Sequence, residues 1–245
     1  MSSILSATAE DSRAAAHAVN INGTFNILEC AYGNDIDKVM LPSSIAAFGN
    51  KTPQELTPND TIQNPDTVYG ISKVFGELMG NYYCSKLNLD VRGLRLPGLI
   101  SWKTEPTSGT TDYAVAMFYE AIKKGHYECY LSPDTALPMM YMPDAISALL
   151  NLYDADRQKL IHNADFNVHA MTFTPEELAK EINRINPKFQ VTYKVDFARQ
   201  AIADSWPRAL DDSVARHEWG WYPQFSLRNL VDDMYENLTK KLYRR

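Results

Sequence analysis

The stretch that decides the fold begins LPSSIAAFGN (41–50), passes through a polar loop that contains prolines, and resumes as VYGISKVFGEL (68–78). The short apolar run at 38–41 ends in Pro42-Ser43-Ser44, which is typical of a strand followed by a polar loop. The apolar positions that follow Val68 have helical spacing. Ligands of open α/β folds bind beyond the carboxyl ends of strands, so we expect Ser44 to lie at a ligand site.

Tyr69 and Lys73 are candidates for proton chemistry at that site. They are four residues apart, which places both side chains on one face of a helix. A lysine ammonium beside a phenol favours the phenolate, so we expect the pKa of Tyr69 to fall below its usual value of about 10. Such a tyrosine can accept a proton from a substrate hydroxyl that Ser44 holds in line. The sequence therefore predicts an alcohol-oxidising site built from Ser44, Tyr69 and Lys73.

The Tyr-x-x-x-Lys spacing is not specific by itself. It also occurs at Tyr82/Lys86 and at Tyr119/Lys123, and by pattern alone it is more often the surface of an amphipathic helix. Neither of these two pairs has an apolar run and a serine upstream at a similar distance. The context, rather than the pair, singles out Tyr69.

The quoted stretch resembles the extended short-chain dehydrogenase/reductase family, which includes the UDP-sugar epimerases and dehydratases. Four later stretches narrow the resemblance to the short-chain type of L-threonine 3-dehydrogenase. They are RLPGLI (95–100), GTTDY (109–113), LPMMYMPD (137–144) and ADSWP (203–207). The resemblance runs from about Leu5 to the C-terminus.

This resemblance implies an α/β fold, a partial Rossmann-like doubly wound parallel sheet whose first strands are missing, with a small α+β C-terminal substrate domain. Residues 1–100 and 136–170 are expected to form the C-terminal half of an NAD-binding domain that carries the catalytic tyrosine and lysine. Residues 101–135 and 171–245 are expected to form the substrate-binding domain.

The first forty residues lack the glycine-rich turn that binds the pyrophosphate of a dinucleotide. The first glycine is Gly23, and a helix is expected over 25–32, ending at Gly33. In the family this helix follows the fourth strand, and 5–7 resembles the end of that strand. We therefore expect a chain that begins about half-way through the nucleotide-binding domain. A truncated gene model, a domain separated from its other half and a degenerate copy remain open alternatives.

The resemblance also implies a reaction, the NAD-dependent oxidation of the 3-hydroxyl of L-threonine to 2-amino-3-ketobutyrate in threonine catabolism. Tyr69 would be the general base, Lys73 would tune it and bind the nicotinamide ribose, and Ser44 would bind the substrate oxygen. The residues expected to bind the cofactor NAD are Tyr69, Lys73, Leu96, Leu99 and Asn20. Those expected to bind the substrate are Ser6, Ser44, Gly109, Thr110, Thr111 and Trp206, and no metal site is expected.

Two other functions compete with this one. A sugar-nucleotide epimerase or dehydratase would have the same fold, but the stretches at 109–112 and 204–207 argue against it. A non-catalytic remnant is supported by the missing phosphate-binding turn, and NAD-dependent activity of this chain alone is accordingly uncertain on sequence grounds. Family members commonly dimerise through the helices near Gly23 and Tyr69, so a homodimer is expected.

The composition excludes several other classes of protein. The chain has 245 residues, of which 45% are hydrophobic, and a formal net charge of −6. No basic stripe favours a nucleic-acid partner, and no apolar run approaches the roughly 18 residues that cross a bilayer. The first thirteen residues carry no secretory pattern, so a cytoplasmic location is expected, with a mitochondrial one as the alternative in a eukaryote. Cys30, Cys84 and Cys129 are expected to be buried reduced thiols.

Several local features complete the predictions. Arg95 is expected to bridge structural groups, Trp219 and Trp221 to pack, and His162 and His169 to lie on the surface or in loops. Thr174 and Glu177 predict a capping box at a helix start. Strands are expected over 36–41, 89–96, 127–131, 166–169 and 189–195. Other helices are expected over 68–83, 113–123, 144–153 and 226–242.

Overall fold

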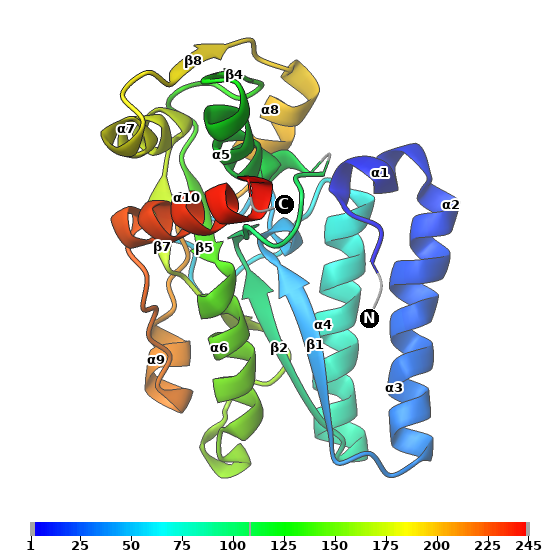
Figure 1. Cartoon of the computed structure of the whole chain (residues 1–245). Helices are drawn as coiled ribbons and strands as arrows, with labels where there is room; N and C mark the ends of the chain where they lie inside the picture. Colours follow the sequence, from blue (N-terminus) through cyan, green and yellow to red (C-terminus); the bar gives the residue numbers. More distant parts are fainter. Residues whose placement is uncertain (1–2, 108, 244–245) are drawn as a thin grey trace.

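The sheet that positions the site is parallel and has the strand order β1-β2-β6 (Figure 1). The computed structural model describes residues 3–107 and 109–243, apart from the side chain of Ala7. The strands of this sheet are β1 (Lys38–Ser44), β2 (Asp90–Leu96) and β6 (Phe166–Asn167). Ser44 and Leu96 are paired at the carboxyl end of β1 and β2. β1 thus runs to Ser44 instead of ending at Leu41 as predicted. Its only strand neighbour among the described residues is β2, and an edge position tolerates the missing N–H of Pro42.

Helices cover both faces of this sheet. α4 (Val68–Leu87) packs on β1 and β2, α3 (Gly23–Gly33) packs on α4, and α6 (Met142–Asp154) packs against β2. Val39 and Leu41 belong to the apolar cluster of α3 and α4, whereas Met40 packs against the cluster of α6. Because neighbouring residues of a strand point to opposite faces, the two clusters lie on opposite faces of the sheet. The predicted α/β fold with a doubly wound parallel sheet is confirmed.

The start of α4 is held by three contacts that also bring it close to the end of β1. The Thr67 side chain accepts a hydrogen bond from the N–H of Gly70 at 3.0 Å, and a Glu10 carboxylate oxygen accepts one from the N–H of Val68 at 2.8 Å. At Gly70 the helix touches the chain that follows β1. A Cβ there would lie 2.1 Å from the carbonyl oxygen of Ala46. Only glycine allows this close approach, which sets the distance between Ser44 and Tyr69.

The N-terminal segment differs from the prediction. Residues 5–7 do not end a strand; α1 (Ser6–Asp11) begins there, and α2 (Arg13–Ala16) and a π-helix (His17–Asn22) lead directly into α3. The side-chain amide of Asn20 accepts a hydrogen bond from the N–H of Ile4 at 2.8 Å and donates one to its carbonyl at 2.9 Å. A side chain therefore satisfies the backbone groups that a neighbouring strand would otherwise bind.

A second group of elements lies above the carboxyl ends of β1 and β2 (Figure 1). Its helices surround one large apolar cluster that includes Phe118, Leu178 and Met234. The predicted capping box at Thr174 and Glu177 is present. The strands are β3 (Gly98–Ile100), β4 (His126–Cys129), β5 (Leu137–Tyr141), β7 (Met171–Phe173) and β8 (Gln190–Tyr193). The helices are α5 (Tyr113–Lys123), α7 (Pro175–Ile185), α8 (Phe197–Asp204) and α10 (Leu227–Tyr243). α9 (Ser213–Trp219) lies lower, beside α6, and packs in the apolar cluster of that helix (Figure 1).

Several side chains outside the site can be compared with their predictions. Cys129 is buried, but Cys84 is half-buried and Cys30 is exposed, so the expectation of three buried thiols is wrong for Cys30. Cys30 lies at an exposed position of α3, where the side chain of Asn34 donates a hydrogen bond to its sulfur at 3.7 Å. His162 is in a loop, as expected, and its ring bridges Glu218 and Asp60. None of the helices within residues 3–107 and 109–243 combines the length and the apolar character needed to cross a membrane.

Candidate active site

A pocket of about 250 Å³ lies at the carboxyl ends of β1 and β2. Segments that are far apart in the sequence meet there: the start of α1, the end of β1, the first turn of α4, the β2–β3 junction and the turn before α5. Each of the predicted site residues except Asn20 lines it. The lining residues are Leu5, Ser6, Pro42–Ile45, Tyr69, Lys73, Leu96–Leu99, Gly109–Asp112 and Trp206.

Ser44 is the last residue of β1 and caps the short 3₁₀ turn Ile45–Ala47. Its oxygen accepts a hydrogen bond from the N–H of Ala46 at 3.2 Å. This bond orients the hydroxyl group, which is also hydrogen-bonded to Tyr69. Ser44 and Tyr69 therefore meet in the pocket as the sequence predicts.

The pKa of Tyr69 differs from the prediction. Burial raises it above its usual value of 10, and the hydrogen bond with Ser44 lowers it by less. The prediction that Lys73 would bring this pKa below 10 is wrong for the chain as described. The reason is that desolvation of the phenolate outweighs the hydrogen bond that favours it.

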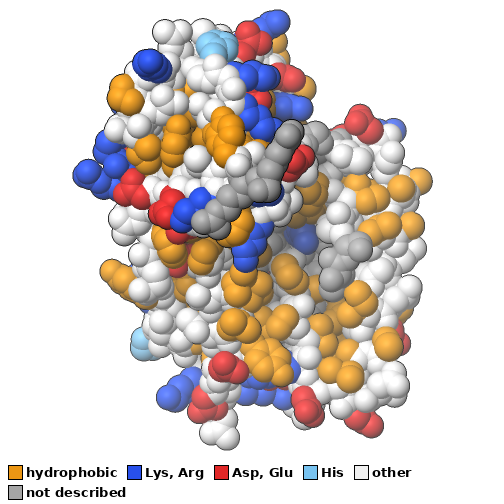
Figure 2. All heavy atoms as spheres, viewed as in Figure 1, with side chains coloured by type: hydrophobic (Ala, Val, Ile, Leu, Met, Phe, Trp, Pro, Cys, Tyr) orange, Lys and Arg blue, Asp and Glu red, His pale blue; other side chains and the backbone are white. Residues whose placement is uncertain are grey.

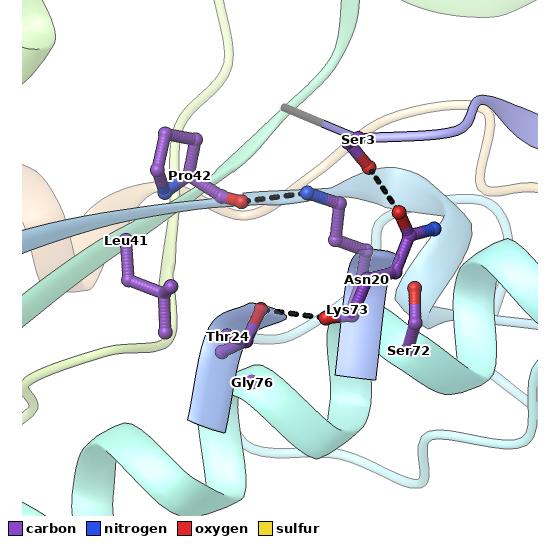
Figure 3. Close-up of a pocket in the computed structure, with 8 residues that line it drawn as sticks. All are labelled: Ser3, Asn20, Thr24, Leu41, Pro42, Ser72, Lys73 and Gly76. Carbon is purple, nitrogen blue, oxygen red and sulfur yellow. Dashed lines mark hydrogen bonds between the residues drawn. The ribbon is translucent and has the colours of Figure 1, made fainter. Parts of the chain in front are cut away.

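Lys73 lies beside Tyr69, with its ammonium nitrogen 5.2 Å from the centre of the phenol ring. The ammonium group donates a hydrogen bond to the carbonyl of Pro42 at 2.9 Å (Figure 3). Burial lowers the pKa of Lys73 from 10.5 to about 8, although the nearby carboxylate of Glu77 raises it. The pKa of Lys73 is therefore close to neutral pH.

The other two Tyr-x-x-x-Lys pairs show why the pattern needs its context. Lys123 lies 5.1 Å from the ring centre of Tyr119, nearly the distance found at Tyr69. Tyr119 packs into the large apolar cluster, and its hydroxyl accepts a hydrogen bond from Lys241. Tyr82 is 51% exposed on the outer side of α4. Neither tyrosine lines the pocket at the strand ends.

Another part of the pocket wall is formed by Gly109, Thr110 and Thr111. Thr110 is only 2% exposed, and its hydroxyl oxygen has no hydrogen-bond partner among the described residues. A buried hydroxyl without a partner costs free energy. It is free to bind a polar group of a molecule in the pocket.

Apolar side chains complete the pocket. Leu96 and Leu99 are half-buried at the β2–β3 junction, and Trp206 is buried beside the end of α8. Ser6 lines the same pocket from the first turn of α1 and is also buried. These side chains can exclude water from the neighbourhood of Tyr69.

Asn20 lies elsewhere, in a smaller cavity of about 50 Å³ that shares Pro42 and Lys73 with the main pocket (Figure 3). It belongs to the π-helix, a feature that often marks functional sites. Its amide group is bound to Ile4 and to the hydroxyl of Ser3. Its contact with a cofactor stays a prediction.

Sequence reasoning missed some of the pocket and its support. Asp112 lines the pocket, and it belongs to a stretch already singled out by resemblance. Glu77 lies outside the lining but bonds to Ser43 and to Arg95. Its position eight residues after Tyr69 on α4 is the signal that could have found it.

Comparison with known proteins agrees with this geometry. The model of the "NAD dependent epimerase/dehydratase family" matches residues 5–168, which is more than half of the chain. The chain belongs to this family. It is 50% identical over 233 residues to the mitochondrial L-threonine 3-dehydrogenase of Bos taurus, covering 95% of this chain and 62% of that relative. The chain thus spans less than two thirds of that relative's length.

Solved structures of relatives superpose closely. The L-threonine dehydrogenase of Phytophthora infestans has a TM-score of 0.96 at 47% identity, over 98% of this chain and 78% of that one. A monomeric L-threonine 3-dehydrogenase from a metagenome, in its apo form, has a TM-score of 0.95 at 45% identity, over 98% and 77%. The described fold is therefore the fold of these enzymes over the shared region.

The buried lysine should cost the protein stability below about pH 8. Lys73 has a lowered pKa in the folded chain, so the unfolded chain binds more protons between about pH 8 and 10.5, and stability should rise over that window. We expect Lys73→Met to increase the free energy of unfolding at pH 7 by about 2 kcal/mol, after allowance for the lost bond to Pro42. The gain should disappear by about pH 10.5.

Urea denaturation at pH 7 and pH 10.5 measures this effect. Lys86→Met, on the exposed end of the same helix, is the control and should change stability by less than about 0.5 kcal/mol. Equal stability of wild type and Lys73→Met at pH 7 would show that the lysine is not desolvated.

Proposed function

We propose that this chain carries the catalytic and substrate-binding part of an NAD-dependent L-threonine 3-dehydrogenase. The observation that carries the proposal is the meeting of Ser44, Tyr69 and Lys73 in one pocket at the carboxyl ends of parallel strands. Similarity to L-threonine 3-dehydrogenases over nearly the whole chain supports the choice of reaction.

The residues present fit the nicotinamide end of the cofactor. An ammonium group has three N–H donors, and the described residues show a hydrogen bond for one of those of Lys73, to Pro42. The others can donate to ribose hydroxyls. Leu96 and Leu99 offer an apolar surface to a flat ring. When bound, NAD would accept the hydride from the substrate carbon.

The chain's own residues would move the proton. Ser44 would orient the substrate hydroxyl toward Tyr69, and Tyr69 would take the proton as a phenolate. Burial destabilises that phenolate, whereas the hydrogen bond from Ser44 and the positive charge of Lys73 would stabilise it. The reaction should therefore speed up as pH rises.

L-Threonine suits the rest of the pocket. Its carboxylate needs N–H and O–H donors, which the turn Gly109–Thr111 can supply, and the hydroxyl of Thr110 has no other partner among the described groups. Ser6 and Trp206 would close the pocket around the small substrate. The proposal assigns residues 1–100 and 136–170 to the cofactor-binding half and 101–135 and 171–245 to the substrate-binding half.

Two alternative functions can be tested separately. A sugar-nucleotide epimerase or dehydratase would need room for a nucleoside diphosphate, and conversion of UDP-sugars would support it. A non-catalytic role would be supported by failure of the chain to bind NAD at millimolar concentration in calorimetry. We place the proposed enzyme in the cytoplasm, with the mitochondrion as the alternative that fractionation of the source cells would reveal.

We propose a homodimer that forms through α3 and α4. Large apolar side chains are exposed on these helices, and Figure 2 shows apolar side chains on this part of the surface. They are Phe25, Ile27 and Tyr32 on α3 and Ile71, Leu78 and Tyr82 on α4. Sedimentation equilibrium should give twice the chain mass for wild type and for Ile161→Glu, an exposed apolar site elsewhere, but the single mass for Leu78→Glu. The single chain mass for all three proteins would contradict the dimer. One similar structure, from a metagenome, is described as monomeric.

Tyr69→Phe tests the proposed base. Threonine-dependent NADH formation, followed by absorbance, should fall by about 10²–10⁴-fold because no group remains to take the proton. Tyr119→Phe is the matched control, since Tyr119 has the same spacing and a similar lysine distance but lies outside the pocket. Its rate should stay within about threefold of wild type. Equal loss in both variants, or none in Tyr69→Phe, would reject the assignment.

Thr110→Val tests the substrate-binding wall. The hydroxyl of Thr110 has no partner in the described chain, so removing it should leave stability unchanged or slightly higher. KM for L-threonine should rise by about tenfold, the effect of one lost hydrogen bond to a charged group. Thermal denaturation and steady-state kinetics measure the two effects. A lower melting temperature with unchanged KM would assign Thr110 to structure alone.

A further inference from the structure

The carboxylate of Glu77 lies one helical turn beyond Lys73 on α4 and outside the pocket lining. Tyr69, Lys73 and Glu77 follow one another at intervals of four residues, so they share one face of the helix. Glu77 is 1% exposed. Glu77 has no role in the proposed reaction, although burying a carboxylate costs free energy.

Four hydrogen bonds hold this carboxylate. Arg95 donates to its Oε2 atom from Nε at 3.0 Å and from Nη2 at 2.9 Å. Gln63 donates to the same oxygen at 2.6 Å, and the hydroxyl of Ser43 donates to Oε1. Such complete pairing offsets the cost of burying a carboxylate.

These bonds join the pieces of the chain that form the site. Ser43 lies between Pro42, whose carbonyl accepts the hydrogen bond of Lys73, and Ser44, which meets Tyr69. Ser43 is also paired with Arg95 across β1 and β2. Glu77 thus ties the end of β1 both to α4 and to β2, within one residue of both active-site contacts.

We propose that Glu77 is a positioning residue of the Ser44–Tyr69–Lys73 site: it fixes the strand end 42–44 against α4 and supplies a negative charge one helical turn away from Lys73. This inference rests on the proposed function only in giving the site its reaction. The geometry that supports it stands without the reaction.

Electrostatics agree with the geometry. Burial lowers the pKa of Lys73, and Glu77 is the charged group that raises it again. The other ionisable groups near Lys73 are Tyr69 on its own helix, Arg95 on β2, which is bound to Glu77, and Asp112, which lines the same pocket. The residues around Lys73 in the smaller cavity, on α3, the π-helix and the N-terminal segment, are Thr24, Asn20 and Ser3, which are neutral.

The test compares wild type with Glu77→Gln and with the double variant Glu77→Gln/Arg95→Met. The single change leaves the buried charge of Arg95 unpaired and can unfold the chain. The double change removes both charges and keeps the volume similar. Arg95 is not among the groups that shift the pKa of Lys73. In the double variant, a change in that pKa therefore still reports the loss of Glu77.

Competitive acetylation of the whole chain over a range of pH, followed by mass spectrometry, gives the titration midpoint of Lys73. Lys86 of the same helix is the internal control. We expect a midpoint near pH 8 in wild type and a midpoint lower by about one pH unit in each folded variant, because an opposite charge has been removed. The midpoint of Lys86 should not move. With L-threonine and NAD, kcat should fall at least about tenfold, while KM changes by less than about threefold.

An unchanged titration midpoint of Lys73 in the double variant would overturn the inference. Glu77 would then be only a structural partner of Arg95. Acetylation needs neither cofactor nor substrate, so its result decides the inference even if wild type fails to oxidise L-threonine. That failure would reject the proposed function instead.

Discussion

The contact between the first three turns of α4 and the carboxyl end of β1 is the constraint on which the site depends. Gly70 lets the helix approach the carbonyl of Ala46, and Lys73 then reaches the carbonyl of Pro42. Glu77 binds Ser43 between them. Because three successive turns of the helix contact one short strand end, Ser44 and Tyr69 have little freedom to move apart.

This arrangement places ionisable groups where water is scarce. Burial raises the pKa of Tyr69 and lowers that of Lys73, so both charged forms are disfavoured in the described chain. Removing these polar groups from water costs free energy. Perturbed groups of this kind cluster at functional sites, and the pocket at the strand ends is where such a site is expected in this fold.

The pocket is shared between the two groups of elements. The end of β1 supplies Ser44 and the helix α4 supplies Tyr69 and Lys73, whereas the elements above the carboxyl end of the sheet supply the turn Gly109–Thr111 and Trp206. The two groups of elements therefore contribute different walls of one pocket. On the second wall, the hydroxyl of Thr110 has no hydrogen-bond partner among the described residues.

The sequence by itself determined the helix that carries Tyr69 and Lys73, the strand that ends near Ser44, and the family, because these depend on local periodicity and on ordered motifs. It failed at 5–7, where the distant Asn20 side chain satisfies the backbone of Ile4 and no strand forms. It also failed for the pKa of Tyr69. Only the tertiary structure decided that pKa and the position of Glu77, since burial and long-range hydrogen bonds come from residues that the spacing along the chain does not relate.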